Sequence, residues 1–427
     1  MNSEHNSHSG IGRELNRMWR ESSCRAPVGY VTLRLATAVI LLCGLVEPFS
    51  ASEKGHLRNH QDRTRSLTND APHSFVAEIS REHSEQAGPA IPSIPGWYEI
   101  PNTQLFPLCP DRPDVQGNSG CQSVISAWNS GIADTKRERL LFWGGGHSDY
   151  LGNELYALDL KKLSMVRLTD PSPVTNVRTC PEAYVDGTPS ARHTYNGLVY
   201  DAKGDAMFAF GGSKSNCGYM SHSSWRLGLE KLQWEQLTPK GPDNPQGAPG
   251  FITSYDSRSG MIYLFDTANF FTFDPERIQF KKLSEQGGVD YHLNGTIDEG
   301  QNYFIMAGGN GQFWGINLNN HSKFKVEDWS RKVSGCEKLM HAAYPGLAYY
   351  PPERSIVGWT GGDSVVLFHL DKMSCEERTY PGGPGPVLQT GSNGRFRYFP
   401  SLGVFALVNN WKQNAFLLRL NTREAKN

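Results

Sequence analysis

Imidazole, phenol and guanidinium side chains gather in a few short polar segments of this chain, each of which borders an apolar run. Their types suit proton transfer on an anionic substrate, because imidazole and phenol exchange protons and guanidinium holds a carboxylate through two parallel hydrogen bonds. The residues expected to take part in catalysis are His147, Tyr150, Arg192, His193, Tyr195 and His292. Those expected to bind substrate are Asp149, Tyr291, His341, Arg395 and Arg397.

One reaction uses all three side-chain types, namely β-elimination of a uronic-acid polymer. A cation or a hydrogen-bond donor neutralises the substrate carboxylate and so acidifies the adjacent C–H, a base removes that proton, and an acid protonates the leaving oxygen. The candidates for binding the carboxylate are Arg192, Arg395 or Arg397. The candidates for the base are His147, His193 or His292, and those for the acid are Tyr150 or Tyr195. The hypothesis requires these segments to meet in space.

The elements that must position them repeat along the chain. A strand motif of alternating apolar residues can be laid in register six times, starting at Tyr156, Trp225, Phe271, Trp314, Val366 and Phe416. Successive starts lie 69, 46, 43, 52 and 50 residues apart, near the period of about 50 that is typical of kelch repeats. Glycine pairs precede four of the copies, at Gly144-Gly145, Gly211-Gly212, Gly308-Gly309 and Gly361-Gly362.

These copies resemble the kelch-type β-propellers over roughly residues 94 to 420. The resemblance implies an all-β fold of six blades, because a seventh would need a repeat that the chain does not show. The expected blades are Val124–Leu168, Tyr195–Leu237, Phe251–Leu283, Gly295–Trp329, Gly346–Tyr380 and Gly394–Leu420. The short strand near Trp97 has no blade of its own, so we expect it to complete the last blade and close the ring.

The polar segments fall at equivalent places in this repeat. Loops between second and third strands, and segments that lead into first strands, emerge on the same face of a propeller, where rigid sheets leave them free to carry function. The first kind contains His147 and Asp149, and the second kind contains His193, His292 and Arg395. We therefore expect the candidate residues to converge on one face.

A narrower resemblance concerns the Gly-Gly-His loop of blade one and the Arg-His-x-Tyr segment before blade two. Both look like patterns in exported bacterial kelch-type proteins, among them the propeller-type ulvan lyases, whose sites use His, Tyr and Arg on one propeller face. The resemblance implies a polysaccharide lyase. Those lyases usually have seven blades, whereas six are counted in this chain.

Two other function classes fit the same fold. A binding propeller would use the same face for affinity toward a glycan or a protein, without proton transfer. Galactose-oxidase-like enzymes are also kelch propellers, and that resemblance would place copper near Tyr291, His292 and His341. A divalent metal held by His147, His193 and His292 is a further alternative.

Each candidate also has a structural interpretation. A histidine after a glycine pair can cap a neighbouring strand, and Arg192 or Arg397 can form ion pairs with Asp149, Asp186 or Asp290. The residues expected to pack within or between blades are Tyr200, Tyr349, Trp143, Trp225, Trp234 and Trp314. What favours function is the collection of several histidines and arginines on one face.

Residues 1–52 are predicted to be a secretory signal peptide, in which arginines precede the apolar run Leu35–Val46 and small residues follow. Met18 is an alternative start that would shorten the leader. The apolar run is short for a membrane span of about 20 residues, which favours cleavage over an anchor. Residues 53–93 are predicted to be a flexible polar linker and 94–427 the propeller. We expect a periplasmic or extracellular protein that is free of the membrane after signal removal.

Export favours disulfides over free thiols or a metal site, since no C-x-x-C pair occurs among the six cysteines that follow the leader. Six cysteines permit 15 pairings, among which the sequence does not decide. The preferred set is Cys109 with Cys121, which are close in sequence, Cys180 with Cys217, which lie on two loops of one blade, and Cys336 with Cys375. The net charge of −1, from 42 Lys and Arg against 43 Asp and Glu, argues against nucleic-acid binding. The expected partner is an acidic polysaccharide or another glycan, bound by a monomer.

Overall fold

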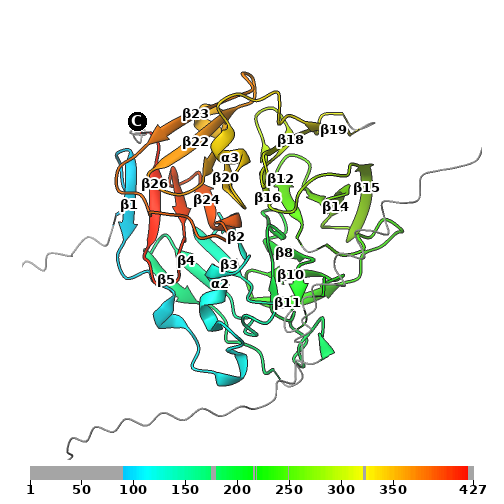
Figure 1. Cartoon of the computed structure of the whole chain (residues 1–427). Coiled ribbons are helices and arrows are strands. Elements are labelled where there is room, and N and C mark those ends of the chain that lie inside the picture. The colour runs from blue at the N-terminus through cyan, green and yellow to red at the C-terminus, as the bar shows by residue number, and fades with distance from the viewer. Residues whose placement is uncertain are drawn as a thin grey trace, which may run out of the picture. The chain divides into compact units, whose positions relative to one another are not determined.

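Six four-stranded antiparallel sheets succeed one another as blades in this computed structural model (Figure 1). The structure describes residues 90–174, 179–214, 217, 219–248, 250–320 and 324–421, which lie in the unit Glu82–Asn427. The first strands of consecutive blades contact one another, and the first strand of blade six contacts that of blade one. The ring is therefore closed, and the predicted six-bladed, all-β propeller is confirmed.

In blades one to five, the strands run outward from the centre in chain order. Blades one to three comprise β2 (Ser130–Asp134), β3 (Arg139–Trp143), β4 (Tyr156–Asp159) and β5 (Ser164–Arg167); β7 (Leu198–Asp201), β8 (Ala206–Phe210), β10 (Ser224–Gly228) and β11 (Gln233–Leu237); and β12 (Ile252–Asp256), β13 (Met261–Phe265), β14 (Asn269–Asp274) and β15 (Gln279–Glu285). Blades four and five comprise β16 (Leu293–Asp298), β17 (Tyr303–Gly308), β18 (Gln312–Asn317) and β19 (Val326–Asp328); and β20 (Gly346–Tyr350), β21 (Ser355–Trp359), β22 (Ser364–His369) and β23 (Ser374–Thr379).

Blade six combines the two ends of the propeller sequence. Its strands are β24 (Phe396–Phe399), β25 (Val404–Leu407), β26 (Ala415–Arg419) and, from the N-terminal side, β1 (Gly96–Ile100). β1 pairs antiparallel with β26 in the register Gly96 to Arg419 through Ile100 to Ala415. The expected closure by an N-terminal strand is confirmed. β1 covers the edge of β26 and is the outermost strand of blade six.

The repeated sequence motif occupies the third strand of every blade, from β4 to β26. Central strands are buried on both sides because the blades pack face to face, and every residue of β8 and β21 is buried. The outermost strands β11 and β23 consist almost entirely of exposed and partly buried residues. Trp143, Trp225 and Trp314 lie in the buried core as expected, whereas Trp234 is only half-buried.

A repeated aspartate ends the first strand in four of the six blades. Oδ1 of Asp134, Asp201, Asp256 and Asp298 accepts a backbone N–H from the turn that follows. Tyr200 and Tyr349 lie one residue before this position in their strands, at the end away from the candidate site. These carboxylates fix hairpin turns and are not available as a catalytic pair.

The remaining elements are short and lie in the connections. They are the 3₁₀ turns η1 (Phe106–Leu108), η2 (Pro113–Val115), η3 (Gly120–Gln122), η5 (Pro351–Glu353) and η6 (Asn393–Arg395), the helices α2 (Ser123–Ser126) and α3 (Glu337–Met340), and the ribbon of β6 (Arg192–His193) and β9 (Ser213–Lys214). Within the described part of the chain, no helix is long and apolar enough to cross a membrane.

The cysteines pair as the sequence predicted. Disulfides join Cys109 to Cys121, Cys180 to Cys217 and Cys336 to Cys375. The first two join connecting segments, and the third ties the segment before α3 to β23 of blade five. The predicted signal peptide and residues 53–89 of the predicted linker lie outside the described residues.

Candidate active site

The blade-one loop rests directly on the strand that carries His193. The N–H of Gly145 donates to the carbonyl of Arg192 at 3.1 Å. Gly146 has a φ of +69°, and a Cβ at this position would lie 2.1 Å from the backbone of Arg192 and His193. Only glycine permits this approach. As a result, the ring of His147 stacks on that of His193, with centroids 5.3 Å apart and an angle of 18° between planes.

A carboxylate orients the second of these imidazoles. Nε2 of His193 bonds Oδ2 of Asp149 at 2.8 Å. The other sides of the His193 ring face Trp128, at 5.2 Å between centroids, and Tyr195, at 6.1 Å. His193 is 3% exposed, so its ring is held in one orientation by packing as well as by the hydrogen bond.

A second histidine and carboxylate lie at the start of blade four. Nδ1 of His292 bonds Oδ1 of Asp290 at 2.5 Å, and the amide of Asn310 donates to the other carboxylate oxygen at 3.2 Å. The ring of His292 lies 4.1 Å from that of Tyr291 and 5.0 Å from that of Tyr344. This arrangement resembles the first pair in having an imidazole fixed by a carboxylate beside a phenol.

Tyrosines connect the two pairs across the ring. The ring of Tyr195 lies 5.9 Å from Tyr291 and 5.9 Å from Tyr344. Tyr195 leads into blade two and Tyr344 into blade five, which are opposite blades, so this contact crosses the ring axis. We call the connected set the ring chain; its members are His147, His193, Tyr195, Tyr344, Tyr291 and His292.

Three members of the ring chain have unusual backbone conformations. His147, Tyr195 and Tyr344 have φ values of +49°, +47° and +50°, a left-handed region that costs non-glycine residues about 1 to 3 kcal/mol. Such conformations persist only where the surrounding structure imposes them. In this protein the ring of His147 lies against that of His193, and the rings of Tyr195 and Tyr344 lie against each other.

Burial sets the protonation of the accessible groups. His147 is exposed, Asp149, Tyr291 and His292 are half-buried, and His193 lies beneath them. Partial desolvation, with a smaller effect of His193, lowers the pKa of His147 below its usual value. The hydrogen bond from His193 lowers the pKa of Asp149. His147 is therefore neutral at neutral pH, and Asp149 is ionised.

The pKa values of the tyrosines shift upward, opposite to those of His147 and Asp149. Burial raises the pKa of Tyr195 to about 12, although a hydrogen bond with Ser213 opposes the shift. Burial also raises the pKa of Tyr291 and Tyr344. Burial acts to raise the pKa of Asp290 as well, but hydrogen bonds from His292 outweigh it and the net shift is downward. The tyrosines therefore remain protonated and can only donate protons near neutral pH.

Tyr150, an expected proton donor, lies inside blade one. Its side chain is fully buried, and its hydroxyl donates to Oε1 of Glu154 at 2.7 Å. The hydroxyl of Tyr156 donates to the same oxygen at 2.8 Å. Burial raises the pKa of Glu154. Tyr150 turns away from His147 because it follows the polar tip of the loop, where the chain re-enters the apolar core.

Two of the three expected carboxylate-binding arginines are also buried. Arg192 is 1% exposed and its guanidinium contacts Ser221, backbone carbonyls and, at 3.8 Å, Glu182. Burial lowers its pKa to about 10. Arg395 is fully buried and donates to the carbonyls of Asn129, Val408 and Gly391. Both side chains hydrogen-bond to loops beneath the face, so neither is available to bind a substrate carboxylate there.

Among the described residues, the three aspartates expected to pair with Arg192 or Arg397 have other partners. Asp149 and Asp290 bond histidines, as described above, and Asp186 accepts hydrogen bonds from Thr188. Arg397 contacts only backbone carbonyls among the described residues. His341 ends α3 and is exposed, next to Gly311. It is the one expected substrate-binding histidine that lies outside the ring chain.

The described residues offer little support for a metal centre. No three His, Cys, Asp or Glu side chains gather there as a metal-binding group. His147 and His193 are neighbours, but His292 is separated from them by Tyr195 and Tyr291. The cysteines of the propeller are all in disulfides, so none remains for the Tyr–Cys link of a galactose-oxidase-like site.

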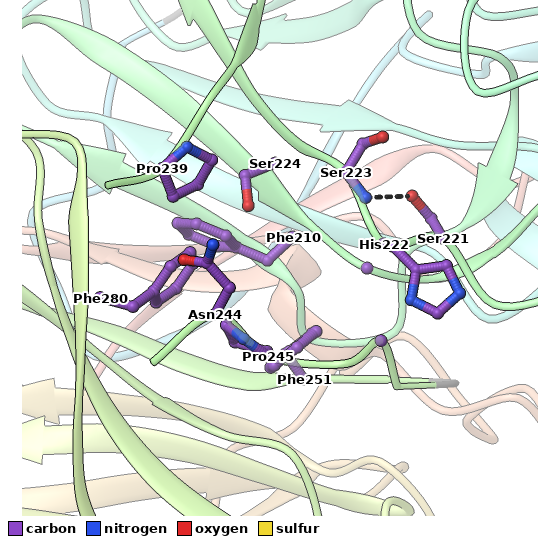
Figure 2. Close-up of a pocket in the computed structure, with 12 residues that line it drawn as sticks. Phe210, Ser221, His222, Ser223, Ser224, Pro239, Asn244, Pro245, Phe251 and Phe280 are labelled. Atoms are coloured by element: carbon purple, nitrogen blue, oxygen red, sulfur yellow. Dashed lines mark hydrogen bonds between the residues drawn. The ribbon is translucent and has the colours of Figure 1, made fainter. Parts of the chain in front are cut away.

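A small pocket lies apart from the ring chain, between blades two and three. Figure 2 shows Phe210 and Phe280 beside Asn244, with His222 at the opposite end. Its volume is about 60 Å³, enough for a few atoms but not for a sugar ring. None of the candidate catalytic residues lines it, and we therefore place the candidate active site at the ring chain.

Comparison with known proteins does not identify a family for this chain. No family model and no curated protein matches this chain. Among solved structures 767 chains match, as expected for a common architecture. One of them, described as "Structure of YjhT", has 11% sequence identity and a TM-score of 0.46, and covers 69% of this chain and 93% of that chain. The kelch-type assignment stays a prediction from sequence.

Three residues of the site environment are not among those expected from the sequence. Trp128 carries no motif, Asp290 is expected only as an ion-pair partner, and Tyr344 is not among the expected site residues. A usable signal existed for the last two. Asp290 lies one residue before Tyr291 and Tyr344 three residues after His341, each in a segment that leads into a first strand.

Proposed function

We propose that this protein is an exported enzyme that cleaves an acidic polysaccharide by β-elimination at the ring chain. The observation that carries the proposal is the chain of imidazole and phenol rings from four blades, with a carboxylate bonded to an imidazole near each end. Carboxylates that fix imidazole tautomers serve proton transfer. A surface that only binds has no need of them. The three disulfides support an exported location.

His147 is the proposed base. It is exposed, it is neutral at neutral pH, and its ring stacks on an imidazole that Asp149 holds in place. Its lone pair would remove the proton adjacent to the substrate carboxylate. Tyr195 or Tyr291 would then protonate the leaving oxygen, because both remain protonated in the neutral range.

Binding of the substrate carboxylate falls to histidines in this proposal. Arg192 and Arg395 are buried behind the face, which leaves His292 and the exposed His341 as hydrogen-bond donors toward blades four and five. Ring N–H groups that hydrogen-bond the carboxylate also stabilise the enolate that forms from it.

A glycan-binding propeller without catalysis is the second candidate, and the withdrawal of Arg192 and Arg395 favours it. A strong lyase site keeps a fixed cation at the carboxylate, whereas a binding face does not require one. Tyr219, which is 71% exposed on the loop after β9, would then supply a flat ring for stacking on a sugar.

The deciding experiment follows absorbance near 235 nm, an approximate wavelength for the unsaturated product of uronate elimination, while purified protein acts on a panel of uronic-acid polysaccharides. We expect a rise with at least one substrate. His147→Ala should reduce the rate by about 100-fold or more, and His222→Ala, an exposed histidine outside the ring chain, should leave it unchanged.

Each alternative predicts a different result. Retention on a polysaccharide column with no change in absorbance would exclude the lyase and support the binding propeller. An equal loss of rate in His147→Ala and His222→Ala would show that the reaction does not depend on the ring chain. Loss of the rate after treatment with a chelator would reveal a divalent metal.

A further inference from the structure

An open groove lies on blade six, on the same face of the propeller as the ring chain. Its volume is about 630 Å³, which is within the range of about 300 to 1,000 Å³ that is typical of small-molecule sites. One wall is the loop between β25 and β26, and the other is the segment that leads into β24. We call it the blade-six groove; it is lined by residues of 384–388 and 409–414 and by Glu99 and Gln104.

Hydrogen bonds between the two walls fix the shape of the blade-six groove. Nδ2 of Asn409 donates to the carbonyl of Pro386 at 2.9 Å, and Nε2 of Gln413 donates to that of Pro384 at 2.8 Å. Asn409 is itself only 3% exposed. The walls are therefore tied to each other before any ligand binds, which reduces the ordering cost of binding.

The lining presents polar groups that the protein itself leaves unused. The side chain of Gln104 is half-buried and forms no hydrogen bond among the described residues, and neither does Nδ2 of Asn410. Glu99 is exposed, and its Oε1 accepts a hydrogen bond from Asn414 at 2.7 Å. Amides both donate and accept hydrogen bonds, and a carboxylate accepts them. The lining therefore suits a ligand that is rich in hydroxyl groups.

Lys412 supplies the positive charge of the groove. Its side chain is exposed and forms no ion pair with any residue that the structure describes. Nζ lies 4.9 Å from the centre of the Trp411 ring and 5.7 Å from that of Phe106, so the two rings hold the ammonium group in place. Phe106 is 55% exposed and leaves an apolar ring beside this charge. A sugar that carries a carboxylate fits this combination, because its ring has an apolar face as well.

One wall of the groove connects it to the ring chain. The segment that begins at Pro384 continues into η6, where the N–H groups of Ser392 and Asn393 donate to the carbonyl of Tyr344 at 3.1 and 3.2 Å. Tyr344 is a member of the ring chain. The two sites therefore lie along one connection on one face, and an extended ligand can contact both.

We infer that the blade-six groove binds sugar units of an acidic polysaccharide, other than those that reach the ring chain. Lys412 binds one carboxylate of this segment, and Gln104, Asn410 and Glu99 bind its hydroxyl groups. The segment has carboxylates spaced between neutral sugars, because Glu99 repels a second carboxylate in the groove. The choice of an acidic polysaccharide rests on the proposed function, whereas the shape and the charges of the groove are independent of it.

Binding is measured without turnover in the His147→Ala background, by biolayer interferometry on immobilised polysaccharide. The probes are the uronic-acid polysaccharide of the panel that binds most tightly and its carboxyl-reduced form, in which each carboxylate is replaced by a primary alcohol. We expect Lys412→Gln to weaken binding of the acidic polymer by about threefold to fivefold and to leave binding of the reduced polymer unchanged. Adding Gln104→Ala should bring the loss to about tenfold. The control Lys372→Gln, an exposed lysine in the turn after β22, should bind both polymers as the background does.

The outcomes separate this inference from the proposed lyase. Equal binding of the acidic polymer by Lys412→Gln and Lys372→Gln would overturn the inference, as would an equal loss for the acidic and the reduced polymer. The absence of binding to every polymer of the panel would overturn it too. Binding that depends on Lys412, with no unsaturated product from the unmodified protein, would support the groove and exclude the lyase. Product formation with binding that does not depend on Lys412 would do the reverse.

Discussion

Individual residues of the candidate site owe their properties to what lies immediately around them. His147 and His193 are both histidines of polar loops, yet one is exposed and the other is 3% exposed and bonded to Asp149. Burial and a neighbouring imidazole lower the pKa of His147. The two histidines are therefore suited to different roles, His147 as a base and His193 as its support.

The pH dependence of activity tests the role of His147. A base must be deprotonated to act, so kcat/KM should fall as pH drops through its pKa, which lies below the usual value of about 6.5. We expect a plateau at neutral pH and an acid limb below about pH 6.5. An acid limb centred above pH 7 would exclude His147 as the base. The measurement is a pH–rate profile at low substrate concentration.

Tyr344 provides a test that separates stability from activity. Its hydroxyl is buried and has no hydrogen-bond partner among the described residues. Tyr344→Phe removes that hydroxyl but keeps the ring that bridges Tyr195 and His292. We expect the free energy of unfolding to stay equal or to rise by up to about 1 kcal/mol. Urea unfolding measures this change.

The matched variant Tyr344→Ala should behave differently. It removes the bridging ring and should destabilise the protein by about 3 kcal/mol. A loss of stability in Tyr344→Phe comparable with that in Tyr344→Ala would mean that the hydroxyl has a bound partner, such as an ordered water molecule.

At the scale of elements, the hairpin turns on the face away from the ring chain connect neighbouring blades. Arg137, in the first turn of blade one, donates to both carboxylate oxygens of Asp205 in the first turn of blade two, at 2.7 and 2.6 Å. The hydrogen bond from Arg137 is the main cause of the lowered pKa of Asp205. This pair holds the turns of two blades together at the outer surface.

Asp205→Asn should lower stability in a pH-dependent way. Because folding lowers the pKa of Asp205, its contribution is present above its unfolded-state pKa of about 3.9 and is lost as pH falls through the folded value. We expect the variant to be less stable by about 1 kcal/mol at pH 7, with the difference shrinking below about pH 4. Urea unfolding at several pH values measures it.

Asp170→Asn is the matched control, because Asp170 bonds Arg167 but is 83% exposed. We expect a change within about 0.5 kcal/mol for this variant. A similar loss of stability in both variants would contradict the ion pair of Arg137 with Asp205. A loss of stability in Asp205→Asn that does not change with pH would contradict it as well.

At the scale of the whole molecule, closure of the ring depends on one N-terminal strand. β1 adds the fourth strand to blade six, and Trp97 inserts between blades five and six. Its ring contacts Trp359 and Phe416 edge-on, and its indole N–H donates to the carbonyl of Asp363 at 3.0 Å. Side-chain packing thus reinforces the backbone pairing of β1 with β26.

Trp97→Ala should destabilise the whole propeller by about 3 kcal/mol or more, because it leaves a cavity between two blades and an unpaired carbonyl. The control is Ile94→Ala, close in sequence but 62% exposed, for which we expect a change within about 0.5 kcal/mol. Denaturant unfolding followed by tryptophan fluorescence compares the two. Equal stability of both variants would show that β1 does not close the ring in solution.

The sequence by itself determined the repeat, the blade number and the closing strand, and it favoured the cysteine pairing without excluding the others. These follow from period and spacing, since a strand motif at intervals of about 50 residues has few ways to bury its apolar faces. It also placed His147, His193, Tyr195 and His292 on one face, because equivalent positions in a repeat emerge on the same side.

Only the tertiary structure decided which side chains meet. The repeat period determines where a loop emerges but not where each of its side chains points. Tyr150, which is expected beside His147, therefore donates a hydrogen bond to Glu154 inside the blade instead. Arg192 and Arg395 were expected at the face and lie behind it. Their directions depend on left-handed backbone turns, on contacts between loops distant in sequence, and on burial, none of which is encoded in the local pattern of residues.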